Sequence, residues 1–295
     1  MTRVAAVDIG TNSTRLLVAD VEDESVRELD RRLEITRLGE GVDERRILLP
    51  RAIARVRNVL AEYRRAVEEA GAERALAFAT SAVRDAENGE AFLGEVEWSY
   101  GFRTALLSGD QEALLTFRGV SAGREVSPRT IVIDVGGGST ELILGSPESV
   151  SFHTSLDLGC VRLTERHGTD LDATAAEVRS ALPALRAERA VNVDGTTAEL
   201  AALTGGRTVT LAAIDDALAW IVGSTDGERR ARLIEPDRSD VLAAGVVVVR
   251  ETLRHLDLNE TTSSDRDLLN GVALAAARLG EPAEGDAPPG AYTCC

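Results

Sequence analysis

The stretch "IVIDVGGGSTELILG", residues 131–145, decides the fold of this 295-residue chain. Apolar strand formers lead into Asp134, three glycines follow, and a second apolar run begins after Ser139 and Thr140. A tight hairpin needs only one or two residues with positive φ, and every glycine costs backbone entropy. Three glycines in a row favour a different purpose, since several backbone N–H groups can then converge on one anion. A wide β-turn with a bulge is the purely structural alternative.

The same pattern occurs once more, earlier in the chain. "DIGTNSTRLLV" begins at Asp8 and "DVGGGSTELIL" begins at Asp134, and they align without a gap. Both contain Asp, an apolar residue, Gly, two variable positions, Ser-Thr, a charged residue and three apolar residues. A strand–turn–strand unit repeated in each half predicts two related domains that face each other across a cleft. Both turns would point into that cleft and suit a ligand with several phosphates.

Apolar periodicity along the rest of the chain predicts alternating strands and helices, which is the α/β class. Amphipathic helices are expected over 49–72, over about 174–189, and from about residue 110, with Asp110 as the N-cap of the last. The predicted domains are 1–120 and 121–280, and a last helix at about 265–280 could pack back on the first. Residues 281–295, rich in Ala, Pro, Gly and acid, are expected to be a flexible tail.

Composition excludes several classes of protein. The net charge is −16 and all 33 basic residues are arginines, which argues against nucleic-acid binding. Asp8 interrupts the first apolar run, and the longest later run, 241–249, is too short to cross a bilayer. We therefore expect a cytoplasmic protein without a membrane segment. Cys160, Cys294 and Cys295 have neither disulfide nor metal spacing.

Charged residues near the predicted strand ends are candidates for chemistry. Glu112 lies in the first turn of a predicted helix, where it could orient a water or simply cap the helix. Arg84 could bind an anion bidentately, or be a surface arginine. Asp8, Asp134 and Glu141 could hold a hard divalent cation with substrate phosphates and water. The alternative for these carboxylates is that they cap N–H groups in their turns.

Other motifs are weaker or missing. "VDGTTAELAAL", residues 193–203, reads as a strand-to-helix turn that either binds an anion or only caps its helix. The three histidines, His153, His167 and His255, show no ligand spacing. The sequence has no Walker A run, no G-x-S-x-G and no G-x-G-x-x-G.

Several motifs together resemble one known family, that of the exopolyphosphatases and guanosine pentaphosphate phosphohydrolases (Ppx/GppA). The resemblance covers about residues 3–280 and implies two ribonuclease H-like domains, as in the actin, Hsp70 and sugar kinase group, that flank a cleft. It also implies Mg²⁺-dependent hydrolysis of the terminal phosphoanhydride of inorganic polyphosphate, or of the 5′-γ-phosphate of pppGpp, by a homodimer. The motifs are "VAAVDIGTNSTRLLVADV", "ATSAVRDAENG", "LLSGDQEALLTFRGV", "IVIDVGGGSTELILG", "SLDLGCVRLTERH", "DGTTAEL", "DRSDVLAAGVVVV" and "SSDRDLLNGVAL".

The resemblance assigns roles to residues of this chain. Glu112 falls on the catalytic carboxylate and Arg84 on the arginine that contacts phosphate. The remaining matched positions form two phosphate loops, with Asp8, Thr11, Asn12 and Ser13 in the first and Asp134, Gly136, Gly137, Gly138, Ser139 and Glu141 in the second. Many relatives carry two adjacent glutamates where this chain has Gln111-Glu112, so we assign the base to the second position.

The expected reaction is direct in-line attack by water on a terminal phosphate. Short polyphosphate chains are the expected substrate, because the extra C-terminal helical domain of longer members is absent. A pppGpp 5′-phosphohydrolase is one alternative, and an ATP-dependent kinase or ATPase on the same scaffold is another. A non-catalytic sensor of polyphosphate or an alarmone is the third, and Gln111 keeps it open.

Overall fold

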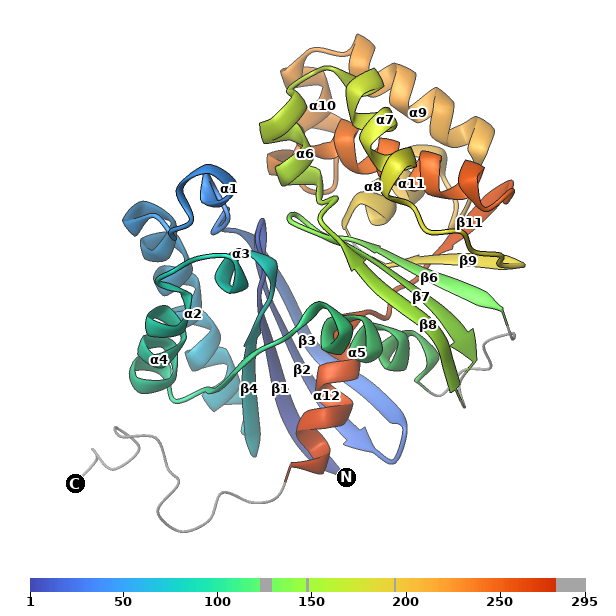
Figure 1. The fold of residues 1–295 in the computed structure, drawn as a ribbon. Coiled ribbons are helices and arrows are strands. Elements are labelled where there is room, and N and C mark those ends of the chain that lie inside the picture. The colour runs from blue at the N-terminus through green and yellow to red at the C-terminus, as the bar shows by residue number, and fades with distance from the viewer. Residues whose placement is uncertain (123–128, 147–148, 194, 280–295) are drawn as a thin grey trace, which may run out of the picture. The chain divides into compact units, whose positions relative to one another are not determined.

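The computed structural model describes residues 1–122, 129–146, 149–193 and 195–279. The chain divides into two compact units, which are considered separately below (Figure 1). Unit 1 comprises residues 1–123 and 268–295, and unit 2 comprises 124–267. The predicted tail over 281–295, with its two terminal cysteines, lies outside the described residues.

A five-stranded sheet forms the centre of unit 1, in the order β3-β2-β1-β4-β5. The first three strands of the chain are antiparallel neighbours, whereas β1, β4 and β5 run parallel. Successive side chains of a strand point to opposite faces, so Ala5, Val7 and Ile9 line one face while Val4 and Ala6 line the other. The strands are β1 (Thr2–Ile9), β2 (Ser13–Glu22), β3 (Ser25–Ile35), β4 (Arg74–Ala79) and β5 (Arg103–Leu106).

Helices cover both faces of this sheet. One face packs against α2 (Pro50–Ala70) and α4 (Gly89–Tyr100), beside the short α1 (Val42–Arg45) and α3 (Ser81–Arg84). The other packs against α5 (Gly109–Ser121) and α12 (Leu268–Arg278), which lie side by side in Figure 1. The helix predicted over 49–72 is therefore confirmed as α2.

Unit 2 repeats the strand arrangement of unit 1 in a six-stranded sheet of order β10-β11-β9-β6-β7-β8. Strands β8, β7 and β6 are antiparallel neighbours, and β6, β9 and β11 run parallel, as the corresponding strands of unit 1 do. The predicted α/β class with two ribonuclease H-like domains is confirmed. The strands are β6 (Thr130–Val135), β7 (Thr140–Ser146), β8 (Ser149–Leu156), β9 (Arg189–Val193), β10 (Thr208–Thr210) and β11 (Glu260–Ser263).

The helices of unit 2 pack against Ile131, Ile133 and Val135 of β6. Because side chains alternate along a strand, Asp134 lies on the opposite face of the sheet. A helix predicted over 174–189 ends at Ala181 instead, since Pro183 disfavours helical backbone at the residue before it. The helices are α6 (Cys160–His167), α7 (Leu171–Ala181), α8 (Gly195–Thr204), α9 (Leu211–Gly223), α10 (Asp226–Arg232) and α11 (Leu242–His255), with a 3₁₀ turn η1 (Pro236–Arg238).

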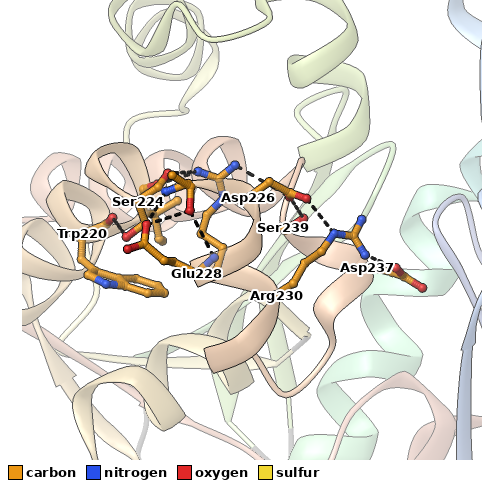
Figure 2. A network of polar contacts seen from close by, with 10 residues as sticks. Trp220, Ser224, Asp226, Glu228, Arg230, Asp237 and Ser239 are labelled. Carbon is orange, nitrogen blue, oxygen red and sulfur yellow. Dashed lines mark hydrogen bonds and ion pairs between the residues drawn. The ribbon is translucent and has the colours of Figure 1, made fainter.

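Polar contacts fasten η1 to α10, as Figure 2 shows. The Asp226 carboxylate accepts hydrogen bonds from Ser239 Oγ (2.6 Å) and Arg230 Nε (2.9 Å). Arg230 also donates through Nη1 to Asp237 (2.7 Å). The hydrogen bonds from Ser239 and Arg230 lower the pKa of Asp226. These contacts hold the segment that carries Arg238.

A buried carboxylate also ties α11 to α7. Glu251 is 3% exposed and accepts hydrogen bonds from Arg179 (3.0 Å), Arg250 (2.9 Å) and Arg254 (3.3 Å). Burial raises the pKa of the Glu251 carboxyl, but the hydrogen bonds and charges of Arg179 and Arg250 outweigh that effect. The pKa therefore lies below its ordinary value of 4.5.

Replacing this carboxylate should destabilise the protein at neutral pH but much less in acid. We expect Glu251→Gln to lower the free energy of unfolding by about 2 kcal/mol at pH 7, because charged hydrogen bonds are lost. A carboxyl whose pKa is lowered by folding stabilises the fold above its unfolded pKa, and that contribution fades as the pH falls. The difference from the unmodified protein, measured by urea unfolding, should therefore shrink between about pH 5 and about pH 3. Glu260→Gln, at an exposed position of β11, should change the free energy of unfolding little. A difference between Glu251→Gln and the unmodified protein that does not vary with pH would contradict this account.

Candidate functional site

Three parallel strands of unit 1 end at the same level. Ile9, the last residue of β1, is in register with Ala79 of β4, which is in register with Leu106 of β5. The segments that follow these strands therefore start at one edge of the sheet. These segments carry the predicted residues Thr11, Asn12, Ser13, Arg84 and Glu112. In an open α/β sheet this edge, at the carboxyl ends of the parallel strands, is where ligands bind.

The first predicted phosphate loop, Gly10–Ser13, is closed by a hydrogen bond from the Gly10 N–H to the Ser13 carbonyl (3.0 Å). The carbonyls of Thr11 and Asn12 also have partners, accepting from the N–H groups of Gly39, Thr36 and Arg37 (2.8–3.0 Å). In a trans peptide the C=O and the following N–H point in opposite directions. The N–H groups of Asn12 and Ser13 therefore point away from that segment.

Two side chains of this loop are also buried. Asn12 is 5% exposed, and its Nδ2 has no hydrogen-bond partner among the residues that the structure describes. Thr11 Oγ1 lies 2.9 Å from Ser81 Oγ, which links the loop to the segment after β4. A buried amide donor without a partner is costly, so an acceptor on a ligand would stabilise this loop.

The structure brings Arg84 and Glu112 together, although 28 positions separate them in the sequence. Arg84 Nη1 lies 3.7 Å from Glu112 Oε2 and donates to the Leu107 carbonyl at 2.7 Å. Glu112 is 6% exposed, whereas the Arg84 side chain is 28% exposed. A partly exposed arginine beside a buried carboxylate can contact an anion while the carboxylate holds a water.

The start of α5 differs from the prediction and clarifies the role of Gln111. Ser108, rather than Asp110, is the N-cap, because its Oγ accepts from the Gln111 N–H at 3.2 Å. In return, the Gln111 Oε1 accepts from the Ser108 N–H at 2.9 Å, which completes a capping box. The Gln111 side chain is therefore engaged in closing the helix, and Glu112 is the buried residue of the pair.

In unit 2 the second predicted loop closes in the same way as the first. The Gly136 N–H donates to the Ser139 carbonyl (2.9 Å), as Gly10 does to Ser13. The start of α6 then binds the loop carbonyls. Gly136 O accepts from the Cys160 N–H, Gly137 O from the next two N–H groups of α6, and Gly138 O from Arg162 Nε (2.7–3.1 Å).

This arrangement fixes the direction of the loop amides. Because the carbonyls of Gly136, Gly137 and Gly138 are bound by α6, the N–H groups that follow them point the opposite way. Three consecutive N–H groups on one side form an anion-binding nest. Gly159 allows α6 to approach, since a Cβ there would lie 2.1 Å from the Gly137 carbonyl oxygen.

Gly159 belongs to one of the family motifs, but its sequence alone predicted no role for it. A glycine directly before a helix is the signal that it contained. The oxygen that this glycine approaches is 22 positions away in the sequence, so the contact required the structure.

The acidic residues of the two repeats differ in their surroundings. Asp134 lies opposite Glu141 in the β6–β7 pair, and both are buried. At the equivalent position of unit 1, Asp8 lies opposite Arg15 and forms an ion pair with it (2.6 Å). The part of the chain that the structure describes contains no cluster of three His, Cys, Asp or Glu side chains around one point.

The Gly-Thr-Thr turn of unit 2 starts α8 at Gly195, while Asp194 lies outside the described residues. The guanidinium of Arg238 lies against this turn, because a Cβ on Gly195 would be 2.0 Å from its Cζ. Glu199, one turn later, accepts from the N–H groups of Ile234 (2.9 Å) and Glu235 (2.6 Å). Burial raises the pKa of the Glu199 carboxyl. Both predicted roles for this turn, anion binding and capping, stay predictions.

Comparisons with known proteins extend over nearly the whole chain. The chain is 36% identical to exopolyphosphatase 2 of Mycobacterium tuberculosis, covering 94% of this chain and 99% of that protein. It is 33% identical to a guanosine-5′-triphosphate,3′-diphosphate pyrophosphatase of Vibrio atlanticus, over 65% of this chain and 39% of that protein.

None of the helices described here is long and apolar enough to span a membrane.

A solved structure shows the same fold. The Ppx/GppA enzyme of Aquifex aeolicus has a TM-score of 0.77 at 29% identity, with 93% of this chain and 99% of that chain covered. The sequence model of the Ppx/GppA phosphatase family matches residues 17–278. The chain therefore belongs to the Ppx/GppA phosphatase family.

Proposed function

We propose that this protein is an exopolyphosphatase that hydrolyses the terminal phosphoanhydride of inorganic polyphosphate. The observation that carries the proposal is the orientation of the loop amides in both units. Carbonyl oxygens, which repel anions, are bound by neighbouring N–H groups, so that the amides of the loops are available for phosphate oxygens. Arg84 beside Glu112 adds a cation and a carboxylate within one unit.

We favour polyphosphate over pppGpp as the substrate because this chain covers more of the exopolyphosphatase relative than of the pyrophosphatase relative. The exopolyphosphatase relative is covered almost entirely, whereas the pyrophosphatase relative is covered over 39% of its length. Hydrolysis of the 5′-γ-phosphate of pppGpp uses the same reaction and is the second candidate. Resolving the two requires parallel assays on both substrates.

We assign a divalent cation, Mg²⁺, to Asp134 and Glu141 of the second loop. The donor set fits, since side chains directly opposite in an antiparallel pair have Cβ atoms about 5 Å apart and Mg²⁺ prefers carboxylate oxygens. Asp8 was also predicted as a ligand, but its ion pair with Arg15 favours a role in holding that arginine. When bound, the cation would neutralise charge on the phosphate oxygens.

The side chains of unit 1 would then carry out the proton chemistry. Glu112 would hold a water by hydrogen bonding and accept its proton as the water oxygen attacks the terminal phosphorus. The bond from that phosphorus to the bridging oxygen breaks, and the shortened chain leaves with the bridging oxygen. Arg84 would contact the terminal phosphate, and the amides of each loop would bind phosphate oxygens.

Two further proposals concern the assembly of the protein, which the family resemblance implies, and its location, which we infer because Asp8 interrupts the first apolar run. We propose that the protein forms a homodimer and that it acts in the cytoplasm. Sedimentation velocity and cell fractionation would test them.

The proposed function is tested by phosphate release from polyphosphates of defined length, pppGpp and ATP in parallel, with and without Mg²⁺. We expect release from polyphosphate that requires Mg²⁺ and needs no acceptor. Faster release from pppGpp would favour the second candidate. Tight polyphosphate binding without release would instead make the protein a sensor.

Removing the carboxylate of residue 112 should slow turnover strongly and leave binding largely intact. We expect Glu112→Gln to lower kcat by about 10²–10⁴-fold, the usual contribution of a positioned general base. The affinity for polyphosphate, measured by calorimetry, should change little. Gln111→Ala is the matched control, because it removes the capping-box partner but not the base; it should lower stability by about 1 kcal/mol and retain activity. If the two variants lose activity equally, Glu112 is not the base.

A methyl group at Gly159 should disturb the second loop directly. Its Cβ would collide with the backbone of Gly137, so the loop amides must move. A displacement of about 1 Å at a reacting group can cost about 100-fold, and we expect a loss of that size in kcat/KM for Gly159→Ala. Gly227→Ala, where a Cβ meets open space, should behave like the unmodified protein. Normal kcat/KM in both variants would disprove the assignment of this loop.

The cation assignment distinguishes Glu141 from Asp8. We expect Glu141→Gln to raise the Mg²⁺ concentration that gives half-maximal activity by at least about tenfold. Asp8→Asn should leave that concentration nearly unchanged, whatever its effect on maximal rate. Chelation by EDTA should stop phosphate release, and added Mg²⁺ should restore it. If both variants raise the Mg²⁺ concentration for half-maximal activity equally, Asp8 is a ligand of the cation as well.

A further inference from the structure

The helix that carries Glu112 is packed against the last helix of the described chain. Both α5 and α12 cover the same face of the unit 1 sheet and lie side by side (Figure 1). Their contact is unusually close at Gly271. A Cβ built there would lie 1.8 Å from the Leu115 carbonyl oxygen and 3.2 Å from the Gly119 nitrogen. Glycine at this position therefore sets the distance between the two helix backbones.

Polar contacts hold both ends of α12 to strands of the unit 1 sheet. Near its start, Asn270 is fully buried, accepts from Arg31 Nη2 (2.9 Å) and donates to Glu28 Oε1 (3.1 Å), both on β3. At its end, Arg74 of β4 donates to the carbonyls of Ala276 and Ala277.

Apolar contacts anchor it as well. Leu269, Val272 and Ala273 are buried in the cluster that includes Val4 and Ala6 of β1. With both ends and the buried face of α12 held, a clash at Gly271 would move α5 more readily than α12.

Leu115 lies three residues after Glu112, within one turn of the same helix. A side chain at residue 271 would require the Leu115 carbonyl to withdraw by about 1.6 Å to reach an ordinary contact of 3.4 Å. The clash is with backbone, so no rotamer change of Leu115 can relieve it. Glu112 would move with that turn, away from its place beside Arg84.

We propose that Gly271 is a positioning residue for the catalytic carboxylate. Because Gly271 lets α12 touch the backbone of α5, it sets the distance between the two helices. That distance determines where the Glu112 carboxylate lies relative to the water and the terminal phosphate. The inference rests on the proposed function, because it takes Glu112 as the general base. It adds that helix α12, which carries none of the proposed site residues, determines the turnover number.

The test is Gly271→Ala, assayed for phosphate release from polyphosphate with Mg²⁺. We expect kcat to fall about 10- to 100-fold, the cost of an ångström-scale misplacement, while KM stays within about twofold. Hydrogen exchange should show faster exchange in α5 and unchanged exchange in β1 and β4.

Two controls separate positioning from loss of stability. Val272→Ala removes a buried side chain of the same helix but adds no atom at the contact with α5, and it should lower the melting temperature by about 3–6 °C but keep kcat. Gly94→Ala makes the same chemical change in α4, where a Cβ meets open space. It should keep kcat and raise the melting temperature slightly, because alanine is the better helix former. The inference fails if Gly271→Ala keeps kcat, or if its kcat falls no more than that of Val272→Ala.

The unmodified protein and Glu112→Gln belong in the same experiment. Phosphate release that depends on Glu112, together with a normal Gly271→Ala, overturns only the positioning role. No release from the unmodified protein overturns the proposed function and, with it, this inference. Faster exchange confined to unit 2 in Gly271→Ala would also contradict the proposed contact.

Discussion

Both candidate phosphate loops depend on one property of the peptide unit, the opposite directions of its C=O and N–H groups. Residues 36–39 bind the loop carbonyls in unit 1, and the start of α6 binds them in unit 2. The partners differ in sequence and in secondary structure, yet the result is the same. In each case the amides are turned to one side before any ligand arrives. This preorganisation is the kind that stabilises charge without reorganisation during a reaction.

The register of the parallel strands explains why distant residues meet in unit 1. Since β1, β4 and β5 end at one level, short connections suffice to bring Thr11 next to Ser81 and Arg84 next to Glu112. The capping box at Ser108 fixes the helix start and occupies the Gln111 side chain, so Glu112 is the residue of this pair that is left for chemistry. Position 111 is thus explained as part of the helix cap.

The sequence predicted the repeated hairpin, the α/β class and the helix over 49–72, because glycine clusters and apolar periodicity are local signals. It also pointed to the loops, to Arg84 and to Glu112. It missed the contact between Gly159 and Gly137, the pairing of Asp8 with Arg15, and Ser108 as the cap. Contacts between distant segments leave no periodic trace, and Ser108 and Asp110 are both good N-caps on propensity alone. The helix that stops at Ala181 shows that one proline overrides apolar spacing.

The place of α12 in the chain has a consequence for biosynthesis. Two helices, α5 and α12, cover the apolar face formed by Val4, Ala6 and Phe78, and α12 is synthesised only after all of unit 2. Unit 2 is continuous in sequence, so it has its own core available before unit 1 does. Unit 1 therefore completes its core last, and its half-covered sheet is the surface that a chaperone would shield during translation.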